Sequence, residues 1–129
     1  MTKVKFAVAG LGRIGKIHLE NLLHMDHVEV VAVMDPIEEC RKYAQEKKIP
    51  HITETFEELL NIAPFDSVVI CSPTDTHADY VEMAAKAGVH IFCEKPLDLS
   101  MQRVVEVLKV VKEANIKLML GFNRRFDKE

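Results

Sequence analysis

Short apolar runs recur along the chain and predict buried β-strands. They are rich in Val, Ile and other β-formers and carry few charges, which is typical of parallel strands that helices cover on both faces. The predicted strands are Val4–Ala9, Val28–Met34, Ser67–Cys71, Val89–Cys93 and Lys117–Leu120, with a weaker candidate at His51-Ile52.

Segments with apolar residues at helical spacing lie between these runs. Thr55 begins a Thr-x-x-Glu capping box, and Thr76 begins a similar Thr-x-x-Asp pattern. Ser100 is a good N-cap, and Gly88 suits the left-handed position after a helix. The predicted helices are about Arg13–Met25, Ile37–Lys48, Phe56–Ile62, His77–Ala87 and Met101–Ala114.

The regular alternation of strands and helices predicts an α/β fold. Such alternation gives a doubly wound parallel sheet with right-handed crossovers. We therefore expect about six strands with helices on both faces, formed by residues 1–121. Residues 122–129 follow the last predicted strand without starting an evident new element.

Length and composition narrow the class of protein. The 129 residues suit one compact domain, and 48% hydrophobic with 29% charged residues is ordinary for a soluble protein. A net charge of −3 argues against a nucleic-acid partner, and the apolar runs are far too short to span a membrane. Cys40, Cys71 and Cys93 form no CxxC pair, which favours a reducing cytoplasmic setting without a metal site.

A glycine-rich turn follows the first predicted strand and opens the first helix. Gly10 allows a tight turn, Gly12 lets the backbone approach a pyrophosphate, and Gly15 permits close packing of helix on strand. The N–H groups and dipole of the first helical turn favour an anion there. The turn Gly10-Leu11-Gly12-Arg13-Ile14-Gly15 thus predicts a dinucleotide-binding Rossmann domain, with all six residues near the cofactor.

Asp35 stands twenty positions after Gly15, at the end of the second predicted strand. A carboxylate at this place accepts hydrogen bonds from the adenosine ribose in dinucleotide-binding domains. Its charge would repel a 2′-phosphate, so the sequence predicts NAD as the cofactor.

Two further segments lie after predicted strands. These are Cys71-Ser72-Pro73-Thr74-Asp75-Thr76-His77 and Cys93-Glu94-Lys95-Pro96. Together with the glycine turn they resemble the glucose–fructose oxidoreductase, inositol dehydrogenase and rhizopine-catabolism family, over the whole chain. The run Gly121-Phe122-Asn123-Arg124-Arg125-Phe126-Asp127 is most similar to the inositol dehydrogenase branch.

The resemblance implies that the cofactor lies along one edge of the sheet. The residues it assigns to the cofactor beyond the glycine turn and Asp35 are Ser72, Pro73, Thr74, His77, Glu94, Lys95, Asn123 and Arg124. The predicted topology supports the place of some of these residues, because ligands of open α/β sheets bind beyond the carboxyl ends of the strands. Gly10, Asp35, Ser72, Glu94 and Gly121 all follow predicted strands and should share that edge.

Lys95 is the catalytic residue that the resemblance implies. It would hydrogen-bond the reacting hydroxyl of a sugar or polyol, with Arg125 also near the substrate. A cation beside the hydroxyl stabilises the developing alkoxide as hydride leaves. Pro96 biases Lys95 toward an extended backbone, and the bond between them can be cis or trans.

The resembled enzymes continue into a second α/β domain that carries an Asp and a His, the usual base. None of the six histidines of this chain follows Lys95. We therefore expect a fragment or short form that binds NAD but catalyses poorly or not at all. Residues 122–129 would lead toward the second domain, and an apolar docking patch would also allow self-association into a homo-oligomer.

Three other functions compete with the dehydrogenase interpretation. A stand-alone NAD-binding or redox-sensing module would need no catalytic base. A methyltransferase using S-adenosylmethionine also has a glycine-rich first turn, but it leaves Gly15 and the Glu94-Lys95-Pro96 segment unexplained. A coenzyme A-binding domain would gain nothing from Asp35.

Overall fold

The computed structural model describes residues 3–62 and 64–121. Strands and helices alternate along this part of the chain, as predicted. The elements are β1 (Val4–Ala9), α1 (Arg13–Leu23), β2 (Val28–Met34), α2 (Glu38–Glu46), β3 (His51–Thr53), α3 (Phe56–Leu60), β4 (Ser67–Ile70), α4 (Thr74–Lys86), β5 (His90–Glu94), α5 (Met101–Ala114) and β6 (Leu118–Gly121).

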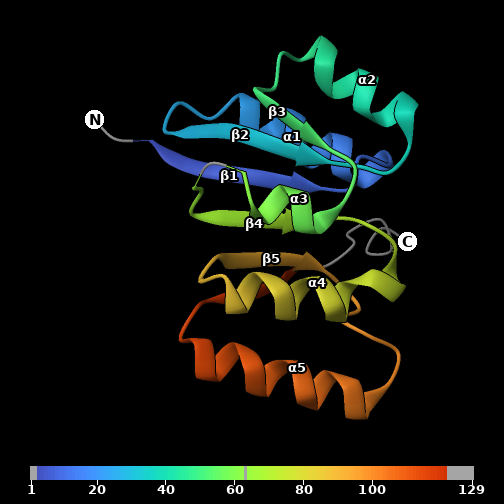
Figure 1. Cartoon of the computed structure of the whole chain (residues 1–129), viewed down its shortest axis with the longest axis vertical. Helices are drawn as coiled ribbons and strands as arrows, with labels where there is room; N and C mark the ends of the chain where they lie inside the picture. Colours follow the sequence, from blue (N-terminus) through green and yellow to red (C-terminus); the bar gives the residue numbers. More distant parts are fainter. Residues whose placement is uncertain (1–2, 63, 122–129) are drawn as a thin grey trace, which may run out of the picture.

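The strands form one parallel six-stranded sheet in the order β3-β2-β1-β4-β5-β6 (Figure 1). The predicted fold class is confirmed. The chain runs outward from β1 to β3, then crosses back to add β4 on the other side of β1. The point between β1 and β4 is therefore the topological switch point, where ligands of such sheets bind.

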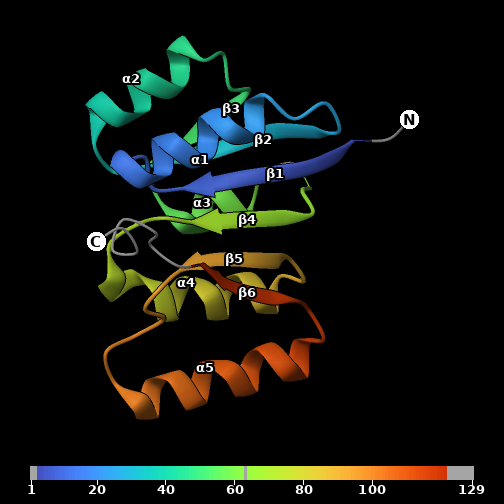
Figure 2. The same ribbon diagram turned by 180° about the vertical axis from the view of Figure 1, so that it is seen from behind.

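Alternating side chains of the central strand enter two separate cores. Ala7 and Ala9 pack in the core beneath α3, α4 and α5, whereas Val8 packs in the core beneath α1 and α2. Figures 1 and 2 show these two helical layers from opposite sides. This two-sided burial explains why the second half of β1, Ala7 to Ala9, is uninterruptedly apolar.

The expectation that all strands are covered on both faces is wrong for β5 and β6. In the described part of the chain no helix lies over these two strands on the α1 side (Figure 2). Met119 of β6 is 64% exposed there. The side chains of this face, among them Phe6, Val69 and Phe92, line an open apolar groove of about 760 Å³ beside α1.

Most helix ends lie where the capping residues predict. The Thr55 capping box is formed, the Ser100 side chain accepts from Arg103 N–H, and Gly88 after α4 has φ +78°. The predicted start of α4 is wrong, since the helix begins at Thr74. Pro73 fixes φ at −57°, close to the helical value, and so starts the helix earlier.

The predicted ends of four strands are wrong by one residue. β3 runs on to Thr53, β4 ends at Ile70, and β5 and β6 each begin and end one residue later than expected. Such shifts are usual, because an apolar run does not fix where ladder pairing stops.

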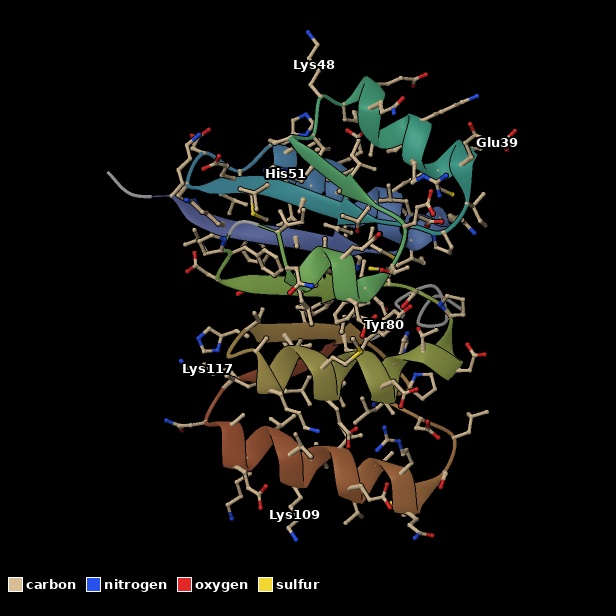
Figure 3. The ribbon with its side chains drawn as sticks, in the orientation of Figure 1. Glu39, Lys48, His51, Tyr80, Lys109 and Lys117 are labelled. Carbon is tan, nitrogen blue, oxygen red and sulfur yellow. The ribbon has the colours of Figure 1, made fainter. Side chains whose placement is uncertain are left out.

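The outer helix faces carry many charged residues, although Met101, Val105 and Leu108 of α5 are exposed as well. Figure 3 shows Glu39 and Lys48 at the two ends of the α2 segment and Lys109 on the outer side of α5. Tyr80 of α4 points inward and stacks on Phe56 of α3, with ring centroids 4.2 Å apart. None of the described helices is long and apolar enough to cross a membrane.

Candidate functional site

A cavity of about 340 Å³ lies at the carboxyl ends of the central strands. It brings together three segments that are far apart in the sequence: the glycine turn, the end of β2 and the loop after β4. Its lining residues are Gly10, Gly12, Asp35, Pro36, Ile37, Cys40, Cys71, Ser72 and Pro73. The cavity lies at the switch point between β1 and β4, where a dinucleotide is expected.

The three glycines of the turn differ in what surrounds them. A Cβ on Gly10 would lie 2.6 Å from the backbone nitrogen of Ser72, and φ is +99° there. A Cβ on Gly15 would overlap the carbonyl oxygen of Gly10. A Cβ on Gly12 would meet no atom within 4 Å, so it would point into open space at the start of α1.

The first turn of α1 presents backbone donors. Gly12 is its N-cap and supplies no side-chain cap. The first N–H groups of any α-helix lack intrahelical partners, and the helix dipole adds positive potential. Arg13 is exposed and Ile14 half-buried at this end, whereas Leu11 is fully buried.

Asp35 is buried and bonded to the glycine turn. Its carboxylate accepts the N–H of Leu11 at 2.7 Å and the N–H of Ile37 at 2.9 Å. Its backbone carbonyl accepts from Arg41. A carboxylate offers about four lone-pair sites, so two filled sites leave acceptor capacity for ribose hydroxyls.

His77 connects the loop after β4 to the loop after β5. It is 2% exposed, with Nε2 2.7 Å from the Ser72 carbonyl oxygen and Nδ1 2.9 Å from the Pro96 carbonyl oxygen. Carbonyls only accept, so making both bonds requires a hydrogen on each ring nitrogen. The prediction that His77 opens the helix is wrong, because it is the fourth residue of α4. The predicted contact of His77 with a cofactor stays a prediction. Both ring nitrogens of His77 already lie within hydrogen-bond distance of backbone carbonyls.

The hydroxyls after β4 are partly engaged with each other. The Ser72 and Thr76 hydroxyl oxygens are 2.7 Å apart, and the Thr76 hydroxyl donates to the Pro73 carbonyl. Thr74 begins α4, half-buried. Ser72 and Pro73 line the cavity, so this loop forms the wall opposite Asp35.

The segment after β5 stands at the same edge of the sheet. The Lys95–Pro96 bond is cis, and the Lys95 N–H donates to the Gly121 carbonyl at 3.1 Å. Lys95 itself is exposed. The predicted residues Asn123, Arg124 and Arg125 lie outside the described residues.

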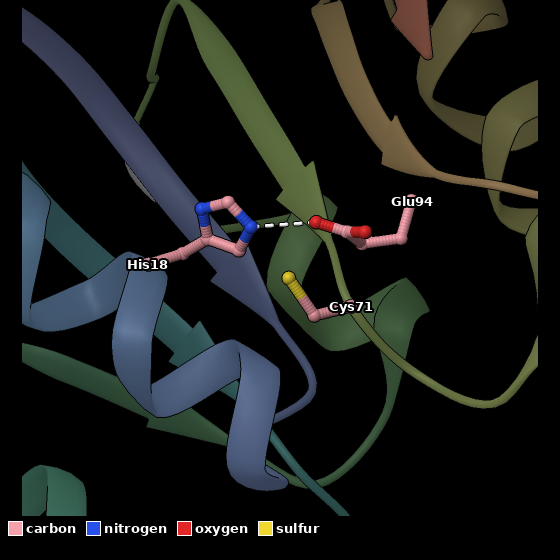
Figure 4. A group of neighbouring side chains, drawn as sticks. All are labelled: His18, Cys71 and Glu94. Atoms are coloured by element: carbon pink, nitrogen blue, oxygen red, sulfur yellow. Dashed lines mark hydrogen bonds and ion pairs between the residues drawn. The ribbon is translucent and has the colours of Figure 1, made fainter. Parts of the chain in front are cut away.

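Glu94 makes a contact that the sequence did not indicate. Its Oε2 lies 2.6 Å from Nε2 of His18, which comes from the middle of α1. Figure 4 shows the two side chains reaching toward each other, with Cys71 beside them. The position of His18 in the sequence does not predict this contact, because only the strand order shows which side of α1 faces the end of β5.

His18, Cys71 and Glu94 are the one group of three possible metal ligands in the described part of the chain, their donor atoms lying within 4.8 Å of one another. Burial, and then the charge of Glu94, raise the pKa of the Cys71 thiol above its usual range. We assign no metal to this group.

Comparison with known proteins agrees with this geometry. A profile of the family described as "Oxidoreductase family, NAD-binding Rossmann fold" matches residues 4–122. An inositol 2-dehydrogenase of Rhizobium meliloti is 44% identical over an alignment of 129 positions that covers 96% of this chain and 37% of that protein. The uncharacterized oxidoreductase YrbE of Bacillus subtilis is 39% identical over 98% of this chain and 38% of its own length.

Solved structures give the same result. The scyllo-inositol dehydrogenase of Lactobacillus casei with bound NAD(H) and scyllo-inositol has a TM-score of 0.90 at 32% identity, covering 98% of this chain and 38% of that one. A probable dehydrogenase of Thermotoga maritima has a TM-score of 0.89 at 40% identity, covering 97% and 38%. The chain thus spans less than two-fifths of the length of these relatives.

Proposed function

Because the chain belongs to the oxidoreductase family with the NAD-binding Rossmann fold, we propose that it is the cofactor-binding part of a dehydrogenase. The reaction would move hydride between NAD and a ring hydroxyl of inositol or a related sugar. The observation that carries the proposal is the cavity that joins the glycine turn to Asp35 at the switch point of the sheet.

The residues around the cavity suit NAD. The open N–H groups of the first turn of α1 would hold the pyrophosphate, with Gly12 leaving room for it. Asp35 would accept the ribose hydroxyls, and its negative charge disfavours the 2′-phosphate of NADP. When bound, NAD supplies a hydride acceptor at its nicotinamide ring.

Lys95 is the residue that we propose to act on the substrate. It is exposed at the edge of the sheet where the strands β4 and β5 end. Its ammonium would donate to the substrate hydroxyl and stabilise the alkoxide as the C–H bond breaks. Asn123 and Arg124 toward the cofactor and Arg125 toward the substrate belong to the same proposal.

Alcohol oxidation also needs a base for the hydroxyl proton. No histidine of this chain follows Lys95. We propose that residues 1–121 form the cofactor domain and that residues 122–129 lead to a second domain that carries the base. Residues 1–129 alone would then bind NAD with little turnover. The three free cysteines fit a reducing cytoplasmic setting for the whole enzyme.

A redox-sensing module without catalysis is the second candidate. It is favoured by the lining of the cavity, because the glycine turn and Asp35 suit cofactor binding and bring no catalytic group into the cavity. Polyol oxidation by a longer polypeptide containing this chain separates the two functions. A longer polypeptide that binds NAD but forms no NADH with myo-inositol, scyllo-inositol or a sugar panel would favour the sensor.

Calorimetric titration of the 129-residue chain tests cofactor binding directly. We expect heat and a raised melting temperature with NAD, and a weaker response with NADP. No heat and no thermal shift at millimolar NAD would refute the proposal.

A further inference from the structure

The hydrogen bond between His18 and Glu94 plays no part in the cavity that would hold the adenosine and pyrophosphate. It joins the middle of α1 to the end of β5, across the intervening strands β1 and β4. We propose that Glu94, positioned by His18, is a fixed negative charge that makes the domain favour the oxidised over the reduced dinucleotide. This inference rests on the proposed function.

The His18 end of the pair packs against Phe92. The His18 ring meets the ring of Phe92 edge-on, with centroids 5.5 Å apart. Its Nε2 then lies 2.6 Å from Glu94 Oε2, and the two side chains are only 28% and 15% exposed. A carboxylate so enclosed is screened by water less than a surface carboxylate is.

The strand order places Glu94 at the nicotinamide end. Asp35 ends β2 and marks the adenosine side, and the glycine turn after β1 marks the pyrophosphate. The remaining half of a dinucleotide must then extend past β1 toward β4 and β5. The ends of those two strands carry Cys71 and Glu94, which Figure 4 shows side by side.

The hydrogen bond does not require a charge on His18. His18 needs a hydrogen only on Nε2 to donate this bond, so the neutral ring suffices. The buried Cys71 thiol is held in its neutral form. The exposed Lys95 ammonium is next in sequence, and it is the same in the parent chain and in every variant of the test below.

The two forms of the cofactor differ in charge where Glu94 lies. The nicotinamide ring carries a positive charge in NAD⁺ and none in NADH. A nearby carboxylate therefore stabilises NAD⁺ binding and leaves NADH binding almost unchanged. Two unit charges 4 Å apart in water attract by about 1 kcal/mol, which corresponds to roughly a fivefold change in affinity.

The test is the ratio of the dissociation constants for NADH and NAD⁺, measured by calorimetry on the 129-residue chain. Glu94→Gln keeps the shape of the side chain and removes its charge, so the ratio should fall about fivefold through weaker NAD⁺ binding. His18→Leu should lower the ratio in the same direction by freeing the carboxylate. His18→Gln carries an amide N–H that can replace Nε2 and should restore the ratio.

Two further variants isolate the role of the pair. In the double variant His18→Leu/Glu94→Gln the ratio should equal that of Glu94→Gln alone, because His18 acts through Glu94. His27→Leu changes an exposed histidine after α1 and should leave the ratio unchanged. Far-ultraviolet circular dichroism checks that each variant folds.

An unchanged ratio in Glu94→Gln, with both dinucleotides still bound, would overturn the inference and leave the proposed function standing. An unchanged or higher ratio in His18→Leu would overturn the positioning role of the histidine. If His18→Leu fails to fold, Glu94→Gln and His18→Gln still decide the question. A parent chain that binds neither dinucleotide would overturn the proposed function, and this inference with it.

Discussion

Alanine at Gly12 and at Gly15 should separate cofactor binding from stability. The two glycines are three residues apart in one turn, and each substitution adds one methyl group. At Gly15 the methyl would overlap the Gly10 carbonyl oxygen, whereas at Gly12 it would meet no atom within 4 Å. Gly15→Ala should therefore destabilise the fold, whereas Gly12→Ala should affect only the binding of a ligand.

The expected magnitudes follow from these surroundings. Inserting a methyl group into packed structure costs about 1–3 kcal/mol, and a backbone carbonyl moves less easily than a side chain. The overlap with a backbone atom places Gly15→Ala at the upper end, about 3 kcal/mol, of which alanine regains up to about 1 kcal/mol over glycine inside a helix, so the net cost should be about 2 kcal/mol. Gly12 has φ −72°, which alanine adopts freely, so the stability of Gly12→Ala should stay within about 0.5 kcal/mol.

Urea unfolding measures the loss of stability in Gly15→Ala, and calorimetry measures the loss of NAD affinity in Gly12→Ala. With a slope of about 1–3 kcal/mol per molar urea, Gly15→Ala should lower the unfolding midpoint by roughly 1 M. Gly12→Ala should keep the midpoint and weaken NAD binding at least about tenfold, because its methyl occupies the space for the pyrophosphate.

Gly88→Ala is the matched control. Its φ of +78° makes alanine strained, but it lies between α4 and β5, at the opposite edge of the sheet. It should cost about 1 kcal/mol and leave NAD affinity unchanged. A Gly15→Ala chain as stable as the parent would refute the packing argument, and undiminished NAD binding by Gly12→Ala would refute the placement of the pyrophosphate.

Three further substitutions test other parts of the structure. Asp35→Asn should reduce NAD affinity more than NADP affinity and cost about 1–3 kcal/mol in urea unfolding, because an amide cannot accept both backbone N–H bonds equally well. Equal losses for the two cofactors would count against the ribose contact. His77→Leu removes the side chain that pairs with the Ser72 and Pro96 carbonyls in two part-buried hydrogen bonds and should cost roughly 1–3 kcal/mol, again by urea unfolding; a loss below about 0.5 kcal/mol would mean that the carbonyls find other partners. Arg103→Met breaks the ion pairs between α4 and α5 and should cost about 1 kcal/mol at pH 7. Because the Arg103 hydrogen bond lowers the pKa of Glu82 from 4.5, that stabilisation exists above about pH 4.5 and is lost as the pH falls, so the gap to the parent should close in acid. A gap that stays constant from pH 7 to pH 3 would contradict this assignment.

The sequence predicted the layered fold because its strands are nearly uniform apolar runs. It located α5 to the residue, since Ser100 and the helical spacing of the following residues agree. It misplaced the start of α4 because a Thr-x-x-Asp pattern also fits inside a helix. The decisive residue was Pro73, whose ring sets the helical φ three positions earlier than Thr76.

The site was predictable as far as it depends on spacing along the chain. The glycine turn and Asp35 stand at fixed separations and do line one cavity. His18 was not predictable, because its partner Glu94 is 76 positions away and only the strand order brings them together. The place of Cys40 in the cavity lining was not predictable for the same reason. A cysteine in a polar helix gives no indication of a site until the fold places that helix beside Asp35.

The uncovered face of β5 and β6 has a consequence for motion. β6 is an edge strand with one neighbour, and its residues are mostly half-buried or exposed, whereas β1 has strands on both sides and a core on each face. Backbone amides open locally where few buried contacts hold them. Amide hydrogens of β6 should therefore exchange with deuterated water many times faster than those of β1, and a protein layer seated on that face would slow them.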